Sequence, residues 1–176
     1  MPSVDPLLKE GLGETVKLFP DFLEKKEKAK RASKFHTPPV HAKKHVIAMM
    51  HTPSGCTAFD NEKYYPKKDD GTRVNGHYNT YRRFEWEKPA RTITQNNGVI
   101  SSLCCVHPGK PYTKNGETLY SDPRCLTLYE LFIVFSLPKN WDVPEWADER
   151  LIRKVVGEGI PPMLIKNLAK PLIDHL

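Results

Sequence analysis

The sequence lacks any long run of apolar residues and contains few cysteines. No stretch approaches the eighteen or so apolar residues that a membrane-spanning helix needs. The first residues show no basic segment followed by an apolar one, so no export signal is visible. The four cysteines form no C-x-x-C pair, a pattern typical of reduced, mostly buried thiols. We therefore expect an intracellular, cytoplasmic protein without a membrane partner.

The composition allows one compact domain, or one small domain with a docking tail, in 176 residues. Hydrophobic residues make up 39% of the chain and the mean hydropathy is −0.55, so the core should be modest. The chain has 27 basic and 21 acidic residues, a formal net charge of +6. This charge favours a polyanionic partner, because Lys and Arg side chains release the counterions condensed on phosphates.

Residues 1–34 are expected to be a polar leader or linker. Their loose stripe of apolar residues is interrupted by Gly11, Gly13 and Pro20. Residues 24–34 (E-K-K-E-K-A-K-R-A-S-K) form a charge run. Such a run is typical of a solvated helix face or a disordered tether, and an arm that follows phosphates is the alternative.

Residues 35–125 are expected to form a β-rich domain that begins with a short helix over residues 41–50. Residues 90–94 alternate like a strand, Asn-Asn-Gly at 96–98 predicts a hairpin turn, and residues 99–106 return as an apolar strand. Lys-Asn-Gly at 114–116 predicts a second reversal.

Residues 126–176 are expected to be helical. Thr127 and Glu130 predict a capping box, with Leu126 and Leu131 where a hydrophobic staple would lie. This arrangement explains both polar residues without a catalytic role.

A second helix is predicted after the two prolines at 161–162. Pro171 should kink or shorten it. Its apolar stripe, for which the chain offers no obvious partner surface, consists of Leu164, Leu168, Leu172 and Leu176.

Several short blocks together resemble one protein family. They are residues 51–60 (H-T-P-S-G-C-T-A-F-D), 81–94 (Y-R-R-F-E-W-E-K-P-A-R-T-I-T), 106–109 (V-H-P-G), 120–124 (Y-S-D-P-R), 124–130 (R-C-L-T-L-Y-E) and 157–162 (G-E-G-I-P-P). The chain resembles the C-terminal half of cytosine-5 DNA methyltransferases, whose last blocks read R-x-L-T-x-x-E and G-N-x-V-P-P. That family's nucleophile block Pro-Cys-Gln, its Glu-Asn-Val block and its Gly-rich cofactor block are absent from these residues.

The resemblance implies an α+β fold. A small β-rich target-recognition domain would precede C-terminal helices that dock on a Rossmann-like catalytic domain supplied by another chain. The implied reaction transfers a methyl group from S-adenosylmethionine to carbon 5 of a flipped cytosine in double-stranded DNA. We expect no catalytic residue here. The catalytic cysteine would belong to the other subunit of a heterodimer that acts in restriction-modification, and the Met1 start favours a natural subunit over a fragment.

The resemblance also implies which residues contact the cofactor. By position, this role falls to Glu158, Gly159 and Ile160, with Gly157 and Pro161 shaping the loop. Glu158 replaces the usual Asn. A carboxylate can accept a hydrogen bond from the cofactor's ammonium group but cannot donate one as an amide can.

A basic and aromatic cluster precedes the predicted hairpin. Arginine can form bidentate hydrogen bonds with phosphate or guanine, so the cluster could contact DNA. The alternative interpretation of the cluster is a basic strand that faces solvent. The resemblance favours DNA contact, and the expected DNA-binding residues are Arg82, Arg83, Lys88, Arg91 and Thr92, near Tyr78, Tyr81 and Trp86. The residues expected to be structural are Arg124, Thr127, Glu130, Pro161 and Pro162.

Other interpretations stay open. A non-enzymatic DNA-binding module or an inactive methyltransferase remnant would share the late blocks. A zinc-dependent nuclease has only the histidines to support it, and no metal site is expected because His41 and His45 lack Cys or carboxylate partners at ligand spacing. Cys104 and Cys105 lie in a predicted strand, which favours packing over nucleophilic roles.

Overall fold

The protein is described by a computed structural model that covers residues 1–138 and 141–173. Over these residues helices outweigh short strands, in agreement with an α+β fold, although the strands are fewer than a β-rich domain predicts. In chain order the elements are β1 (Leu7–Leu8), α1 (Leu12–Leu18), α2 (Phe22–Ala32), β2 (Val40–His41), α3 (Lys43–Met50), the 3-10 helix η1 (Ala58–Asp60), β3 (Pro111–Lys114), β4 (Glu117–Tyr120), α4 (Leu128–Val134), α5 (Glu149–Glu158) and α6 (Pro162–Ile173).

The first 34 residues are packed against the rest of the protein rather than forming a free linker. β1 pairs in parallel with β2, with Leu7 opposite Val40. Phe22 of α2 is fully buried in a cluster that also contains Met50 of α3 and Leu119 of β4. The charge run lies on α2 and is mostly exposed, as the solvated-face interpretation predicted. The apolar stripe therefore anchors this segment.

The predicted hairpin around residues 96–98 is wrong. Residues 90–106 form a series of turns with no regular strand. The side chain of Asn97 donates to the carbonyl of Thr94 (2.8 Å) and to that of Arg153 in α5 (2.9 Å). Residues 99–106 instead make single bridges elsewhere, from Val106 to Arg83 and to Cys125. Some of the segment's hydrogen bonds close local turns, and others are made with distant parts of the chain.

The second predicted reversal, at residues 114–116, is confirmed. β3 and β4 form an antiparallel hairpin in which Lys114 pairs with Glu117. Asn115 and Gly116 occupy the turn with φ of 53° and 80°, the left-handed conformation that a tight hairpin turn requires and that Asn and Gly tolerate best.

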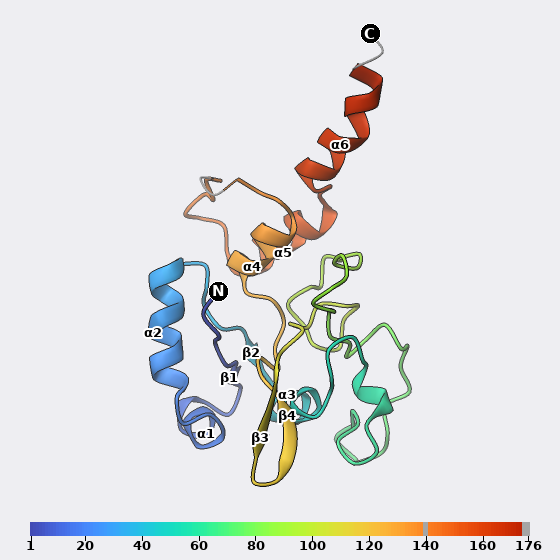
Figure 1. The fold of residues 1–176 in the computed structure, drawn as a ribbon. Coiled ribbons are helices and arrows are strands. Elements are labelled where there is room, and N and C mark those ends of the chain that lie inside the picture. The colour runs from blue at the N-terminus through green and yellow to red at the C-terminus, as the bar shows by residue number, and fades with distance from the viewer. Residues whose placement is uncertain (139–140, 174–176) are drawn as a thin grey trace.

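The described part of residues 126–173 contains three helices rather than the two expected. The unpredicted one, α5, begins at Asp148, whose Oδ1 accepts from the backbone N–H of Leu151 (2.7 Å). Its buried face carries Ile152 and Val156, which pack with α4 in one apolar cluster. Figure 1 shows α6 projecting away from the rest of the molecule. Among the described residues, no helix is long and apolar enough to cross a membrane.

Candidate functional site

The capping box at the start of α4 forms as predicted. Thr127 Oγ1 accepts from the backbone N–H of Glu130 (3.3 Å), and Glu130 Oε2 accepts from that of Thr127 (2.8 Å). Leu126 and Leu131 are buried in the cluster beside it, as expected for a hydrophobic staple. Thr127 and Glu130 thus cap the start of α4, which is the arrangement that the structural interpretation expects.

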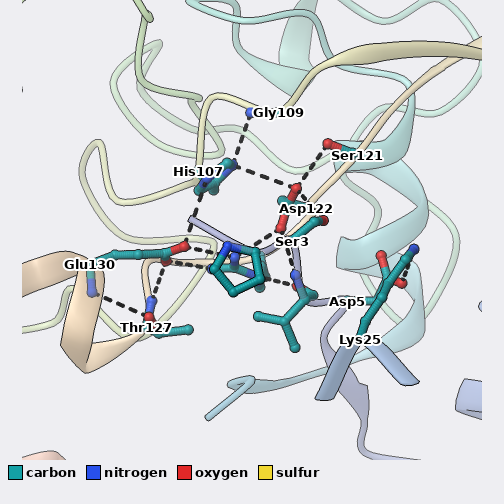
Figure 2. Close-up of polar contacts among 12 residues, drawn as sticks. Ser3, Asp5, Lys25, His107, Gly109, Ser121, Asp122, Thr127 and Glu130 are labelled. Carbon is teal, nitrogen blue, oxygen red and sulfur yellow. Dashed lines mark hydrogen bonds and ion pairs between the residues drawn. The ribbon is translucent and has the colours of Figure 1, made fainter. Parts of the chain in front are cut away.

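Arg124 makes this capping box part of a larger buried cluster. Its Nη1 and Nη2 donate to the two Glu130 carboxylate oxygens at 2.7 and 2.9 Å, and Nη2 also donates to Asp122 Oδ1 (2.8 Å). Figure 2 shows Asp122 and Glu130 converging on this centre. Arg124 has no exposed surface, so the first and last residues of the 124–130 block hold each other. Sequence reasoning missed Asp122, although it lies in one of the quoted blocks.

The buried charges shift one another's proton affinities. Burial by itself would raise the pKa of Asp122 and Glu130, but the Arg124 guanidinium outweighs it and lowers the pKa of Asp122 far below its ordinary value and that of Glu130 to about 2. Burial disfavours the Arg124 cation, yet the two carboxylates raise its pKa. All three groups are therefore charged at neutral pH.

His107 lies between the two carboxylates in Figure 2. Its Nδ1 accepts from the backbone N–H of Gly109 (3.0 Å), and its Nε2 is 3.8 Å from Glu130 Oε1. Burial lowers the pKa of His107 to about 4, with Arg124 adding to the effect. The imidazole is therefore neutral at pH 7.

The N-terminal residues close the cluster on another side. Asp122 accepts from the Ser3 hydroxyl (2.8 Å) and from the backbone N–H of Val4 (3.2 Å). His36 Nδ1 lies 2.8 Å from Thr127 Oγ1 and its Nε2 lies 3.0 Å from the carbonyl of Pro2. Because a carbonyl can only accept, Nε2 carries the proton. The contacts of Ser3, Val4 and His36 with Asp122 and Thr127 each span more than 90 positions and make the first residues part of the same unit.

Arg83 is buried rather than exposed, which corrects its expected position on a surface that contacts DNA. It is 1% exposed, and its guanidinium donates to the carbonyls of His107 (2.6 Å), Met49 (2.8 Å) and Asp122 (3.2 Å). Burial lowers the pKa of Arg83 to about 9. A side chain at Gly109 would lie 2.5 Å from Arg83 Nη1, so that glycine makes room for it. In this fold Arg83 joins chain segments and has no surface for a phosphate.

The other basic candidates lie at the surface. Lys88, Arg91 and Thr92 are exposed and Arg82 is half-buried. Glu85 pairs with Lys88 (2.7 Å) and with Arg91 (3.5 Å), which partly neutralises both cations.

Two large aromatic side chains are exposed in the same region. Tyr78 is 67% exposed and Trp86 52%. Trp86 Nε1 donates to the carbonyl of Gly109 (2.6 Å), and Lys110 Nζ lies 5.7 Å from the Trp86 ring centroid. Cations beside exposed aromatic faces can contact phosphates and stack on bases.

The expected cofactor loop is partly helical. Gly157 and Glu158 are the last residues of α5, Gly159 caps it, and Pro162 is the first residue of α6. Pro162 therefore starts a helix as predicted. Ile160 is 62% exposed. The predicted cofactor residues lie together on one exposed connection between two helices.

The chemistry of this connection fits one end of S-adenosylmethionine. The Glu158 carboxylate is half-exposed and its pair with Lys154 is long, at 4.0 Å, so it is free to accept from an ammonium group. Gly159 and Ile160 are open to solvent. These residues can supply one wall of a pocket, and an enclosed site needs a second surface.

α6 leaves its apolar stripe uncovered. None of its described residues is buried, and Leu164, Leu168 and Leu172 are 49%, 63% and 71% exposed. Leu176, the fourth residue of the predicted stripe, lies outside the described residues. Pro171 lies inside the helix, which continues to Ile173.

The buried cysteines and histidines make contacts inside the protein. Cys104, Cys105 and Cys125 are buried and all four cysteines are free, as expected. His41 Nε2 accepts from the backbone N–H of Cys125 (3.2 Å), while His45 lies beside Tyr81 (3.3 Å). Over residues 1–138 and 141–173, no group of three or more His, Cys, Asp or Glu side chains is arranged to hold a metal ion.

The comparisons with known proteins give the class to which this chain belongs. The model of the C-5 cytosine-specific DNA methylases matches residues 9–174, so the chain belongs to that family, as the resemblance of its blocks implied. It is 42% identical over 142 residues to the Type II methyltransferase M1.HgaI of Avibacterium volantium, a match that covers 81% of this chain and 39% of that protein. The chain thus spans about two-fifths of this curated relative. No solved structure matches it.

Proposed function

We propose that this chain is the DNA-recognition and C-terminal half of a cytosine-5 DNA methyltransferase, and that a separate polypeptide supplies the catalytic half. The observation that carries the proposal is the family match over residues 9–174 in a sequence without the Pro-Cys-Gln and Glu-Asn-Val blocks. The nucleophile therefore comes from outside these residues. The uncovered stripe of α6 supports the proposal because it offers a surface on which a catalytic domain could dock.

Each part of the chain would have a distinct task. Arg82, Lys88, Arg91 and Thr92 would contact double-stranded DNA around the flipped cytosine, and the Arg124 cluster would keep this surface rigid. Glu158 would orient the cofactor by accepting from its ammonium group, while Gly159 and Ile160 exclude water from one side. When bound, S-adenosylmethionine supplies the methyl group. The Type II relative supports a role in restriction-modification.

Co-expression tests this proposal. The chain is produced in a host without cytosine-5 methylation, together with a polypeptide that carries the missing blocks, and host DNA is bisulfite-sequenced. Protected cytosines at one recurring sequence are expected only when both chains are present. Binding of duplex DNA without any protected cytosine would favour the alternative, a non-enzymatic DNA-binding module or inactive remnant.

A further inference from the structure

Asn97 and Arg153 form a buried reciprocal pair between segments that are distant in sequence. Arg153 Nη1 donates to Asn97 Oδ1 (3.1 Å), while Asn97 Nδ2 donates to the backbone carbonyl of Arg153 (2.9 Å). Asn97 Nδ2 also donates to the carbonyl of Thr94 (2.8 Å). Both paired residues are buried, Asn97 at 2% and Arg153 at 5% exposure. One amide group therefore fixes the turn at residues 94–97 relative to α5.

The backbones of the same two segments are in direct contact at Gly157. A Cβ at this position would lie 2.4 Å from the carbonyl oxygen of Thr94 and 2.7 Å from the backbone nitrogen of Gln95, closer than any real side chain is found. Arg153 Nη2 also donates to the carbonyl of Leu126 (2.9 Å), at the start of α4. These contacts thus join the turn, α5 and the start of α4 in one connection.

This connection lies between the two surfaces assigned above. Arg91 and Thr92 are exposed a few residues before the turn, and residues 158–160 follow Gly157 directly. A buried polar pair is costly to desolvate, and an apolar pair could hold the segments at least as firmly. A fully hydrogen-bonded pair additionally favours one alignment of the turn relative to α5, because each donor must meet its own acceptor.

We propose that Asn97 and Arg153 are positioning residues that keep the DNA-facing residues Arg91 and Thr92 in register with the cofactor-facing segment 158–160. Neither residue touches a ligand. Each ligand then binds more tightly when the other is present, because a ligand that orders one segment also orders the other through this pair, and linkage is reciprocal. This inference rests on the proposed function of the two segments.

The test measures this mutual effect in the complex of the chain with its catalytic polypeptide. The affinity for S-adenosylhomocysteine is determined by calorimetry with and without a duplex that the wild-type complex methylates. The wild-type complex should bind it about tenfold more tightly with the duplex. Asn97→Asp loses both side-chain donors but keeps an acceptor for Arg153. For this variant the ratio of the affinities for S-adenosylhomocysteine with and without the duplex should fall to near one. The affinity for each ligand alone should change less than about threefold.

Asn96→Asp is the matched control, since the same chemical change occurs at an exposed neighbour, and it should keep the wild-type ratio. An Asn97→Asp complex that melts like wild type and keeps the full ratio overturns the inference. Arg153→Lys retains the charge but cannot reach all the acceptors of the guanidinium. Its ratio must also fall, and it decides the question if Asn97→Asp does not fold.

The wild-type complex separates the inference from the proposed function. If it methylates DNA but its affinity for S-adenosylhomocysteine is the same with and without the duplex, the proposed function stands and the coupling is overturned. If it methylates no DNA, both are overturned before any variant is made.

Discussion

The side chains of the cluster around Arg124 are buried, whereas those of helix α6 are exposed. Around Arg124 each charge finds its partner inside the protein, as the bidentate contact with Glu130 shows. On α6 an apolar stripe that includes Leu168 faces solvent. The charges of the Arg124 cluster are paired within this chain, whereas α6 exposes apolar surface that association with another protein would bury. The comparison teaches that the buried cluster serves stability, whereas α6 serves the assembly that we propose, so variants should affect one without the other.

The largest effect is expected for Arg124→Ala. It leaves the carboxylates of Asp122 and Glu130 buried without their cation, which should cost about 3–5 kcal/mol of unfolding free energy. The measurement is urea denaturation of the isolated chain. Arg150→Ala, at an exposed position of α5, is the control and should stay within about 0.5 kcal/mol of wild type. Equal denaturation midpoints for both variants would show that the cluster contributes little.

Leu168→Asp should have the reverse profile. Its side chain is 63% exposed, so the isolated chain should unfold at the wild-type urea concentration. Co-purification with the catalytic polypeptide should be lost, because docking would bury an unpaired carboxylate at a cost of several kcal/mol. Asn167→Asp adds the same charge at the exposed neighbouring position and should leave co-purification intact. Normal pairing of Leu168→Asp would mean that α6 is not the docking element.

The pH dependence of stability should come from the buried region. The folded protein holds the pKa of His107 at about 4 and that of His41 at about 3, below the ordinary 6.5. As the pH falls below 6.5, the unfolded chain therefore binds protons first, and stability drops by about 1.4 kcal/mol per pH unit for each such histidine. Glu130, with its pKa lowered to about 2, extends the loss at lower pH.

The check is a series of urea midpoints between pH 7 and pH 4.5. Unfolding of His107→Gln should take up one proton fewer, so its stability should depend less steeply on pH than that of the wild type. Leu168→Asp on α6 should keep the wild-type dependence of stability on pH. A His107→Gln variant with an unchanged slope would contradict the assignment of this titration to the cluster.

The smallest effect is expected at the surface that we propose contacts DNA. Arg91→Ala in the assembled enzyme should lower the log–log dependence of DNA affinity on salt by about one for the lost phosphate contact. Arg31→Ala, at an exposed position of α2, is the control and should leave the slope unchanged. An identical slope for Arg91→Ala would place this side chain away from the phosphates, since Glu85 already pairs with it.

The sequence predicted features that depend on neighbouring residues. The capping box of Thr127 and Glu130 and the turn at Asn115 involve positions at most three apart, so their chemistry was visible in the pattern. The family blocks also located the connection at residues 157–162. α5 was missed, although Asp148 and the spacing of its apolar residues were available as signals.

Features set by distant contacts were not predictable in this way. Arg82 and Arg83 are adjacent and chemically identical, yet only Arg83 is buried, because it finds carbonyl acceptors 24 and 34 positions away. Asn97 looked like a hairpin residue, but its amide bonds to Arg153, 56 positions on. No local pattern distinguishes these outcomes.

The most direct test of the central claim is transfer of a labelled methyl group from S-adenosylmethionine to DNA by purified components. The 176-residue chain, the catalytic polypeptide and their mixture are assayed side by side. We predict transfer to carbon 5 of cytosine only in the mixture, because one component carries the nucleophile and the other the recognition surface. Robust transfer by the 176-residue chain alone, or none by a stably assembled mixture, would contradict the account.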